Sequence, residues 1–175
     1  MFKSAALAAV IGLAAAHPSS LVCMAEGDNR LKPGAIIMGK TVVTDITTLS
    51  FKADATSYKP GVPVTFTIDQ VPAGAFWALR ASDQVGNFTK FSDDVAYTTG
   101  CPSQVITPNG PTDPAAPPSS ATVEWTAPAG TTNPAVTFTI VWAFGTVPSG
   151  SFEGYVKTRD IALPLSSPRP LTVQA

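Results

Sequence analysis

The chain of 175 residues contains one histidine and two cysteines, so few of its side chains suit nucleophilic catalysis or transition-metal binding. A serine or cysteine nucleophile needs a neighbouring base, and a structural zinc site needs several thiolate or imidazole ligands. Charged residues make up only 13% of the chain, the formal net charge is −1, and no basic cluster is present. Because nucleic acid is bound mainly through lysine and arginine, we expect neither a catalytic residue nor a nucleic-acid partner.

The first residues, 1–16, have the pattern of a signal peptide. Lys3 supplies a positive charge, and the apolar run 5–16 ends on small alanines that suit signal peptidase. This run is too short for a membrane helix, which needs roughly 20 apolar residues. We expect cleavage after Ala16, a mature single domain of residues 17–175, and secretion without a membrane anchor.

The two cysteines, Cys23 and Cys101, both lie in the part of the chain expected to be secreted. An even pair of cysteines in an oxidising compartment forms a disulfide by default. We therefore expect a Cys23–Cys101 bridge that ties the N-terminal segment to the body of the domain. A loop of this length predicts a stabilisation of about 4–5 kcal/mol from the lost entropy of the unfolded chain.

From Thr41 onward, β-branched and aromatic residues recur in short runs separated by proline- and glycine-rich turns. Runs of this kind without a 3.6-residue period indicate strands. In the clearest run, 62–69, apolar residues alternate with threonines, so one face should be buried and the other hydroxylated. The other expected strands are 41–45, 49–53, 76–81, 95–98, 122–126, 135–143 and a short one within 152–157.

This pattern predicts an all-β fold, an immunoglobulin-like antiparallel β-sandwich of about seven to nine strands. Residues 86–89 are expected to lie in a connection between strands. Residues 107–120 contain five prolines and few apolar side chains, so they are expected to form an exposed loop.

Several segments also occur in an order known from one protein family. They are Tyr58-Lys59-Pro60-Gly61 leading into 64–68, then 76–81, Gly86-Asn87-Phe88, Cys101, 123–128 and 136–138. With these segments, residues 17–143 resemble the Reeler domain, named for the N-terminal region of reelin. The resemblance implies an extracellular immunoglobulin-like sandwich of matrix and adhesion proteins, cytochrome-linked membrane proteins and secreted defence proteins. It implies no catalytic residue, and it places Cys23 and Cys101 where family cysteines pair.

His17 would become the N-terminal residue of the mature chain, where an amine and an imidazole can chelate copper together. Lytic polysaccharide monooxygenases use this arrangement with a second histidine, which this chain lacks. Asp93 or Asp94 would have to complete the site, and their hard oxygens suit Cu(II) less specifically than imidazole does. The same two aspartates could hold calcium or form a solvated turn. We expect no cofactor, with a copper site at His17 as the alternative.

The three tryptophans could either fill the core or present their rings to a glycan. Trp142 lies on the apolar register of its strand and is expected in the core. For Trp77 and Trp125 both alternatives stay open, so these two are the candidate ligand-binding residues.

Asn87 begins Asn87-Phe88-Thr89, which matches the N-glycosylation acceptor pattern. A turn role and a glycan both predict that Asn87 is exposed.

The expected secretion, the disulfide-linked β-sandwich and the lack of a recognisable group of catalytic residues together favour a secreted, non-catalytic binding or adhesion module. Its partner would be an extracellular protein or glycan of the matrix, a cell surface or a microbial polymer. One alternative is a copper-binding protein or copper-dependent oxidase built on His17. Another is a structural coat or matrix protein, which would assemble as its concentration rises.

The disulfide can be tested on the secreted protein. Intact-mass analysis should give a chain that begins at His17 and has no free thiol. Cys101→Ser should lower the thermal midpoint markedly, because the unfolded chain regains its loop entropy. An unchanged midpoint would show that the two cysteines do not stabilise the fold as a pair.

Overall fold

The computed structural model describes residues 32–37, 40–45, 47–72, 75–82, 85–93, 95–97, 105–108, 120–146 and 151–166, and every regular element in them is a strand. These strands are β1 (Ile36–Ile37), β2 (Lys40–Thr44), β3 (Ser50–Ala53), β4 (Val64–Asp69), β5 (Ala75–Ala81), β6 (Asn87–Phe91), β7 (Val95–Tyr97), β8 (Val105–Pro108), β9 (Ser120–Thr126), β10 (Ala135–Thr146) and β11 (Ser151–Pro164). No helix in the described ranges is long and apolar enough to cross a membrane.

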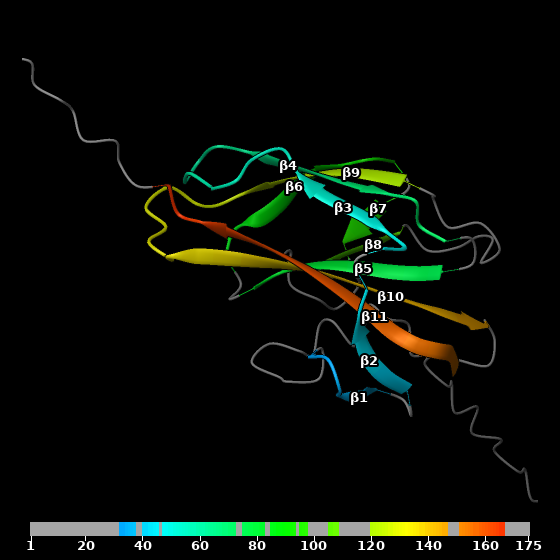
Figure 1. Cartoon of the computed structure of the whole chain (residues 1–175). Coiled ribbons are helices and arrows are strands. Elements are labelled where there is room, and N and C mark those ends of the chain that lie inside the picture. Colours follow the sequence, from blue (N-terminus) through cyan, green and yellow to red (C-terminus); the bar gives the residue numbers. More distant parts are fainter. Residues whose placement is uncertain are drawn as a thin grey trace, which may run out of the picture.

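The strands form two sheets that pack face to face (Figure 1). The smaller sheet has the strand order β3-β4-β9-β6, and the larger has the order β1-β2-β11-β10-β5-β8-β7. The pairings are antiparallel except that β11 runs parallel to β2, with Val156 opposite Val42. Parallel neighbours need a long connection, and nearly the whole domain lies between these two strands. The expected all-β sandwich is confirmed, and the described residues add one isolated parallel bridge, between Tyr58 and Leu165.

The core lies between the sheets because inward-facing residues alternate with polar ones along each strand. Val64, Phe66 and Ile68 of β4 are all buried, and the residues between them are less so. The opposing face of β10 contributes Val136, Phe138, Ile140 and Trp142 in the same way, all fully buried. Aromatic rings make the contact between sheets: the Phe138 ring lies 4.3 Å from that of Phe66 and 4.9 Å from that of Trp125, centroid to centroid.

The strand predictions agree with the structure over most of the chain, and their errors share a cause. Residues 86–89 were expected in a connection, but Asn87–Phe91 is β6, an edge strand paired with β9. The last strand was expected to be short, but Ser151–Pro164 pairs along β10 for nearly its whole length. Both strands are specified by distant partners and carry little local signal. Within 107–120, Thr107 and Pro108 belong to β8 and Ser120 to β9; residues 109–119, expected as the loop, lie outside the described ranges.

Gly86 is the glycine on which the packing of the smaller sheet depends. Its φ is +70°, in the left-handed region that side chains disfavour. A Cβ atom here would lie 2.5 Å from the Thr126 carbonyl oxygen and 2.7 Å from ring carbons of Trp125. The Trp125 indole also donates a 3.0 Å hydrogen bond from Nε1 to the Val85 carbonyl oxygen. The turn before β6 therefore lies directly against the central core tryptophan.

Gly86→Ala should destabilise the domain by about 2–5 kcal/mol, because it adds an overpacked contact to the cost of a left-handed alanine. Urea unfolding followed by tryptophan fluorescence would measure this loss. The matched control is Gly130→Ala, where φ is +82° but nothing lies within 4 Å of the added methyl group. The control should lose only about 1–2 kcal/mol. Equal losses in the two variants would contradict the proposed contact with Trp125.

Candidate functional site

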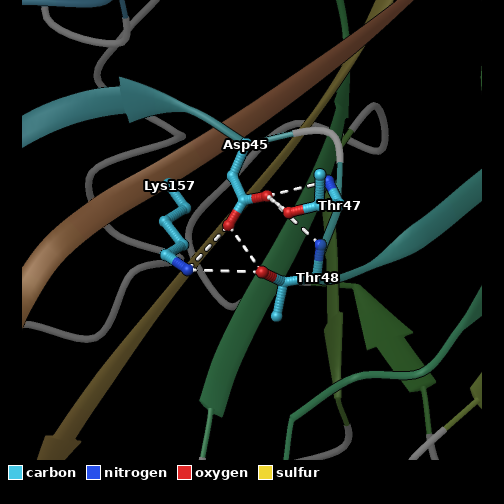
Figure 2. Close-up of polar contacts among 4 residues, drawn as sticks. All are labelled: Asp45, Thr47, Thr48 and Lys157. Carbon is cyan, nitrogen blue, oxygen red and sulfur yellow. Dashed lines mark hydrogen bonds and ion pairs between the residues drawn. The ribbon is translucent and has the colours of Figure 1, made fainter.

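The described charged side chains meet most closely where the chain passes from the larger sheet to the smaller, between β2 and β3 (Figure 2). Asp45 Oδ2 lies 2.6 Å from Lys157 Nζ of β11 and accepts a 2.6 Å hydrogen bond from the Thr48 hydroxyl. Asp45 Oδ1 accepts hydrogen bonds from the Thr47 amide at 2.8 Å, the Thr47 hydroxyl at 3.0 Å and the Thr48 amide at 3.2 Å. Both carboxylate oxygens of Asp45 thus accept hydrogen bonds from groups of the protein itself.

This environment changes the pKa of Asp45. Burial alone would raise the pKa, but the hydrogen bonds from Lys157, Thr48 and the two backbone amides outweigh burial and hold it far below its usual value. A carboxylate so stabilised is ionised at neutral pH and is a poor proton acceptor. The cluster therefore does not have the properties of a catalytic base.

Its geometry instead fixes the path of the chain between the sheets. Lys157 lies opposite Trp142 across β10 and β11, so its stem follows the inner face while its ammonium group reaches Asp45. Arg159, also on that face of β11, donates a 2.8 Å hydrogen bond to the Leu49 carbonyl oxygen. The two cations of β11 hold the connection between β2 and β3 at both of its ends.

The other predicted site residues lie apart from this cluster. His17, Cys23, Cys101 and Asp94 fall outside the described residues, so the copper site and the disulfide stay predictions. Asp93 is exposed. In the described part of the chain, no group of three or more histidine, cysteine, aspartate or glutamate side chains could hold a metal ion.

Of the two alternatives left open for Trp77 and Trp125, the structure shows burial in the core, and the alternative of a ligand platform is wrong. Trp77 is 1% exposed and Trp125 is fully buried, so neither ring has a face for a glycan. Trp142 is fully buried, as predicted. For Trp125 the signal was local: Val123 and Trp125 lie two residues apart on one strand, which places both on the same face.

Asn87 is exposed at the start of β6, where it lies opposite Thr126 of β9. Residues directly opposite across two strands share a face, so Asn87 is at the margin of the outer face of the smaller sheet. Thr89, which completes the glycosylation pattern, is exposed as well. The predicted exposure of Asn87 is confirmed, and glycosylation itself stays a prediction.

The outer face of the smaller sheet is a surface that sequence analysis anticipated only on one strand. We call it the hydroxyl face, and it is defined by Ser50, Thr65, Thr67, Ser120, Thr122 and Thr126, all half-buried or exposed. The register places Thr67 opposite Thr122 at its centre. Thr67 also lies opposite Lys52 of β3, and Glu124 of β9 forms a 3.0 Å ion pair with Lys90 of β6. The face is therefore polar across all four strands.

The Asp45 cluster yields a prediction about acid stability. Asp45→Asn should lower the free energy of unfolding at pH 7 by about 1–3 kcal/mol, because it leaves the Lys157 ammonium half-buried without its counter-charge. A carboxylate with a lowered pKa stabilises the fold above its unfolded-state pKa, and this contribution declines as pH falls toward the folded-state value. The difference between wild type and variant should therefore shrink between about pH 5 and pH 2.

Urea unfolding at several pH values would measure this difference. Asp160→Asn is the matched control, since Asp160 is an exposed carboxylate that directly follows Arg159 on the same strand. A difference that stays constant from pH 7 to acid would contradict the assigned role of the Asp45 carboxylate.

No family model and no curated protein sequence matches this chain, whereas solved structures do. The Reelin-N domain of F-spondin superposes with a TM-score of 0.55 at 20% identity, covering 73% of this chain and 93% of that one. One human F-spondin reeler domain structure gives 0.54 at 19% identity, covering 73% and 94%. A second gives 0.50 at 18% identity, covering 78% and 98%. The chain therefore has the fold of a reeler domain, as its sequence resemblance predicted.

Proposed function

We propose that the protein is a secreted, non-catalytic binding or adhesion module that contacts an extracellular protein or glycan through the hydroxyl face. The observation that carries this proposal is the contrast between the two sheets. The smaller sheet presents a continuous polar outer face, whereas apolar residues on the outer face of the larger sheet, among them Val42 and Val141, are buried.

The chemistry of the hydroxyl face suits an extended, uncharged or weakly charged partner. Threonine and serine hydroxyls can each donate and accept hydrogen bonds. On a sheet they repeat at about 4.8 Å between strands and about 7 Å along a strand, so many weak contacts can form in parallel. The charged residues around the face include both signs, Lys52 and Lys90 against Asp69 and Glu124, which does not favour a strongly anionic polymer.

Asn87 bears on which part of the face is available. It lies at the β6 edge of the hydroxyl face, so a glycan there would cover the neighbourhood of Thr126 and leave the β3–β4 side open. A partner would then approach over Ser50, Lys52 and Thr67. Comparing wild type with Thr89→Ala, which removes the acceptor pattern without changing Asn87, would separate the two situations.

The proposal can be tested by screening the secreted protein against arrays of glycans and extracellular proteins. A double variant, Thr67→Ala with Thr122→Ala, removes the central pair of hydroxyls. Two lost hydrogen bonds at about 0.5–1.5 kcal/mol each should weaken binding of any partner found by about 5- to 150-fold. Titration calorimetry or surface plasmon resonance would measure the change.

The matched control is Thr137→Ala with Thr139→Ala, which makes the same chemical change on the outer side of β10 in the larger sheet. The control should bind as wild type does. Equal weakening in both double variants, or none in either, would place the contact elsewhere. Turnover of a substrate without binding of any polymer or protein would contradict the proposed non-catalytic role.

A further inference from the structure

Charged groups of opposite sign stand at the two margins of the hydroxyl face, in one row across the smaller sheet. The Asp54 amide donates a 3.0 Å hydrogen bond to the Thr65 carbonyl oxygen, so these two residues are neighbours. Thr65 lies opposite Glu124, and Lys90 lies opposite Glu124 on its other side. Residues opposite one another across strands share a face. The row therefore begins with a carboxylate beside β3 and ends with an ammonium group on β6.

Both end groups of this row are open to a partner. Asp54 is exposed, one of its carboxylate oxygens accepts the Thr65 amide at 3.0 Å, and no cation of the described residues lies within ion-pair distance of it. The Lys90 side chain is 75% exposed, although its ammonium group lies 3.0 Å from Glu124. An exposed pair of this kind contributes little to stability, so Lys90 can turn toward a second carboxylate at small cost.

We propose that the partner of the hydroxyl face is the hydroxyl face of a second copy of this chain. This inference rests on the proposed binding role of the face and names its partner. The smaller sheet has the order β3-β4-β9-β6, so a twofold axis parallel to the strands and midway between β4 and β9 places β3 of one copy over β6 of the other. Sheets packed face to face lie about 10 Å apart, with their strands within about 30° of each other.

This arrangement brings opposite charges together. Asp54 and Lys90 lie in the same row at equal distances from the axis, so Asp54 of each copy faces Lys90 of the other. In the same row, Thr65 faces Glu124 of the other copy and can donate its hydroxyl to that carboxylate. The contact forms twice, because the twofold axis repeats it.

The next rows fit the same axis. Thr67 of one copy faces Thr122 of the other, and Asp69 faces the hydroxyl of Ser120. A twofold axis across the strands, through the row of Thr67, would instead place Lys52 of each copy against its own symmetry mate. Like charges brought together in an interface are unfavourable. The charge pattern therefore selects the axis that is parallel to the strands.

The face offers less to a sugar ring than to another sheet. Among the described residues, the large apolar side chains exposed to solvent are Ile36, Val62 and Tyr97, and none of them lies on the four strands of the smaller sheet. Phe91 of β6 is partly buried and packs against the core. A sugar ring thus has no exposed aromatic face on which to stack, whereas short serine and threonine side chains allow two sheets to approach closely.

The size of the face sets the strength of the contact. Four strands about 4.8 Å apart, each about as long as the six residues of β4, give a face of roughly 20 by 20 Å. Two such faces bury about 800 Å² in total, less than the roughly 1,200 Å² of a stable specific complex. We therefore expect pairing to be weak in solution and stronger where many copies are held on one surface.

Sedimentation equilibrium of the secreted chain, enzymatically deglycosylated so that no glycan at Asn87 interferes, tests the proposal. Wild type should show a reversible monomer–dimer equilibrium at concentrations up to about 1 mM. Asp54→Lys and Lys90→Glu each place like charges at both symmetry-related contacts, so each should weaken dimerisation by about 5- to 30-fold. A one-to-one mixture of the two variants should recover the wild-type affinity, because every contact of the mixed pair again joins opposite charges.

Asp160→Lys is the matched control, since it reverses an exposed charge on the outer face of the larger sheet, and it should dimerise as wild type does. The substituted side chains are exposed, so the urea midpoints should stay nearly unchanged and show that each variant is folded. A wild-type chain that stays monomeric, or a mixture that associates no better than either variant alone, would overturn the proposal. The broader binding role of the hydroxyl face is decided separately, by the array screen and the Thr67→Ala, Thr122→Ala double variant.

Discussion

Phe138 makes aromatic contacts that join the two sheets. Its ring contacts Phe66 of β4 and Trp125 of β9, so one side chain of the larger sheet packs against both central strands of the smaller. Trp125 in turn meets Tyr58 edge to face, with 5.6 Å between ring centroids. Buried aromatic groups of this size dominate the energetics of a small core. The turn at Gly86 and the edge strand β6 depend on this cluster, because the Trp125 ring leaves no room for a side chain at Gly86.

Polar contacts complete the sandwich where its aromatic core ends. Asp45, Lys157 and Arg159 fix the connection from β2 to β3, which carries the chain from one sheet to the other. On the other side of the sandwich, the Tyr97 hydroxyl of β7 donates a hydrogen bond to the Phe88 carbonyl oxygen of β6. The Tyr58 hydroxyl donates to the Asn133 carbonyl oxygen at 2.5 Å, and burial raises the pKa of that phenol. These groups are used in holding the fold together, which is why the most polar described cluster supports no catalytic role.

The two outer faces of the sandwich differ in character, and this difference has consequences for binding. An antiparallel sheet with one face in water shows the alternation of apolar and hydroxylated residues seen along β4 and β9. The strands β10 and β5 are instead buried on both faces at Val141 and Ala78, a pattern typical of a covered sheet. The outer face of the smaller sheet is therefore polar, whereas the outer face of the larger sheet contains buried apolar residues. This contrast is the reason for placing the proposed binding face on the smaller sheet.

Local alternation in the sequence was sufficient to predict the all-β sandwich, the hydroxylated face of β4 and the buried position of Trp142. Hydrophobic periodicity and turn residues are patterns of a few neighbouring positions, so they can be recognised in the sequence without knowledge of the fold. β6, the length of β11, the burial of Trp77 and the parallel pairing of β2 with β11 could not be predicted in this way. Each depends on which distant strand lies alongside. For Trp77, the adjacent Phe76 is also large and apolar, so the alternation did not show which of the two faces the core. The Asp45–Lys157 pair joins residues more than a hundred positions apart, and only the tertiary structure brings them together, because strand pairing and sheet packing are set by contacts that no local pattern encodes.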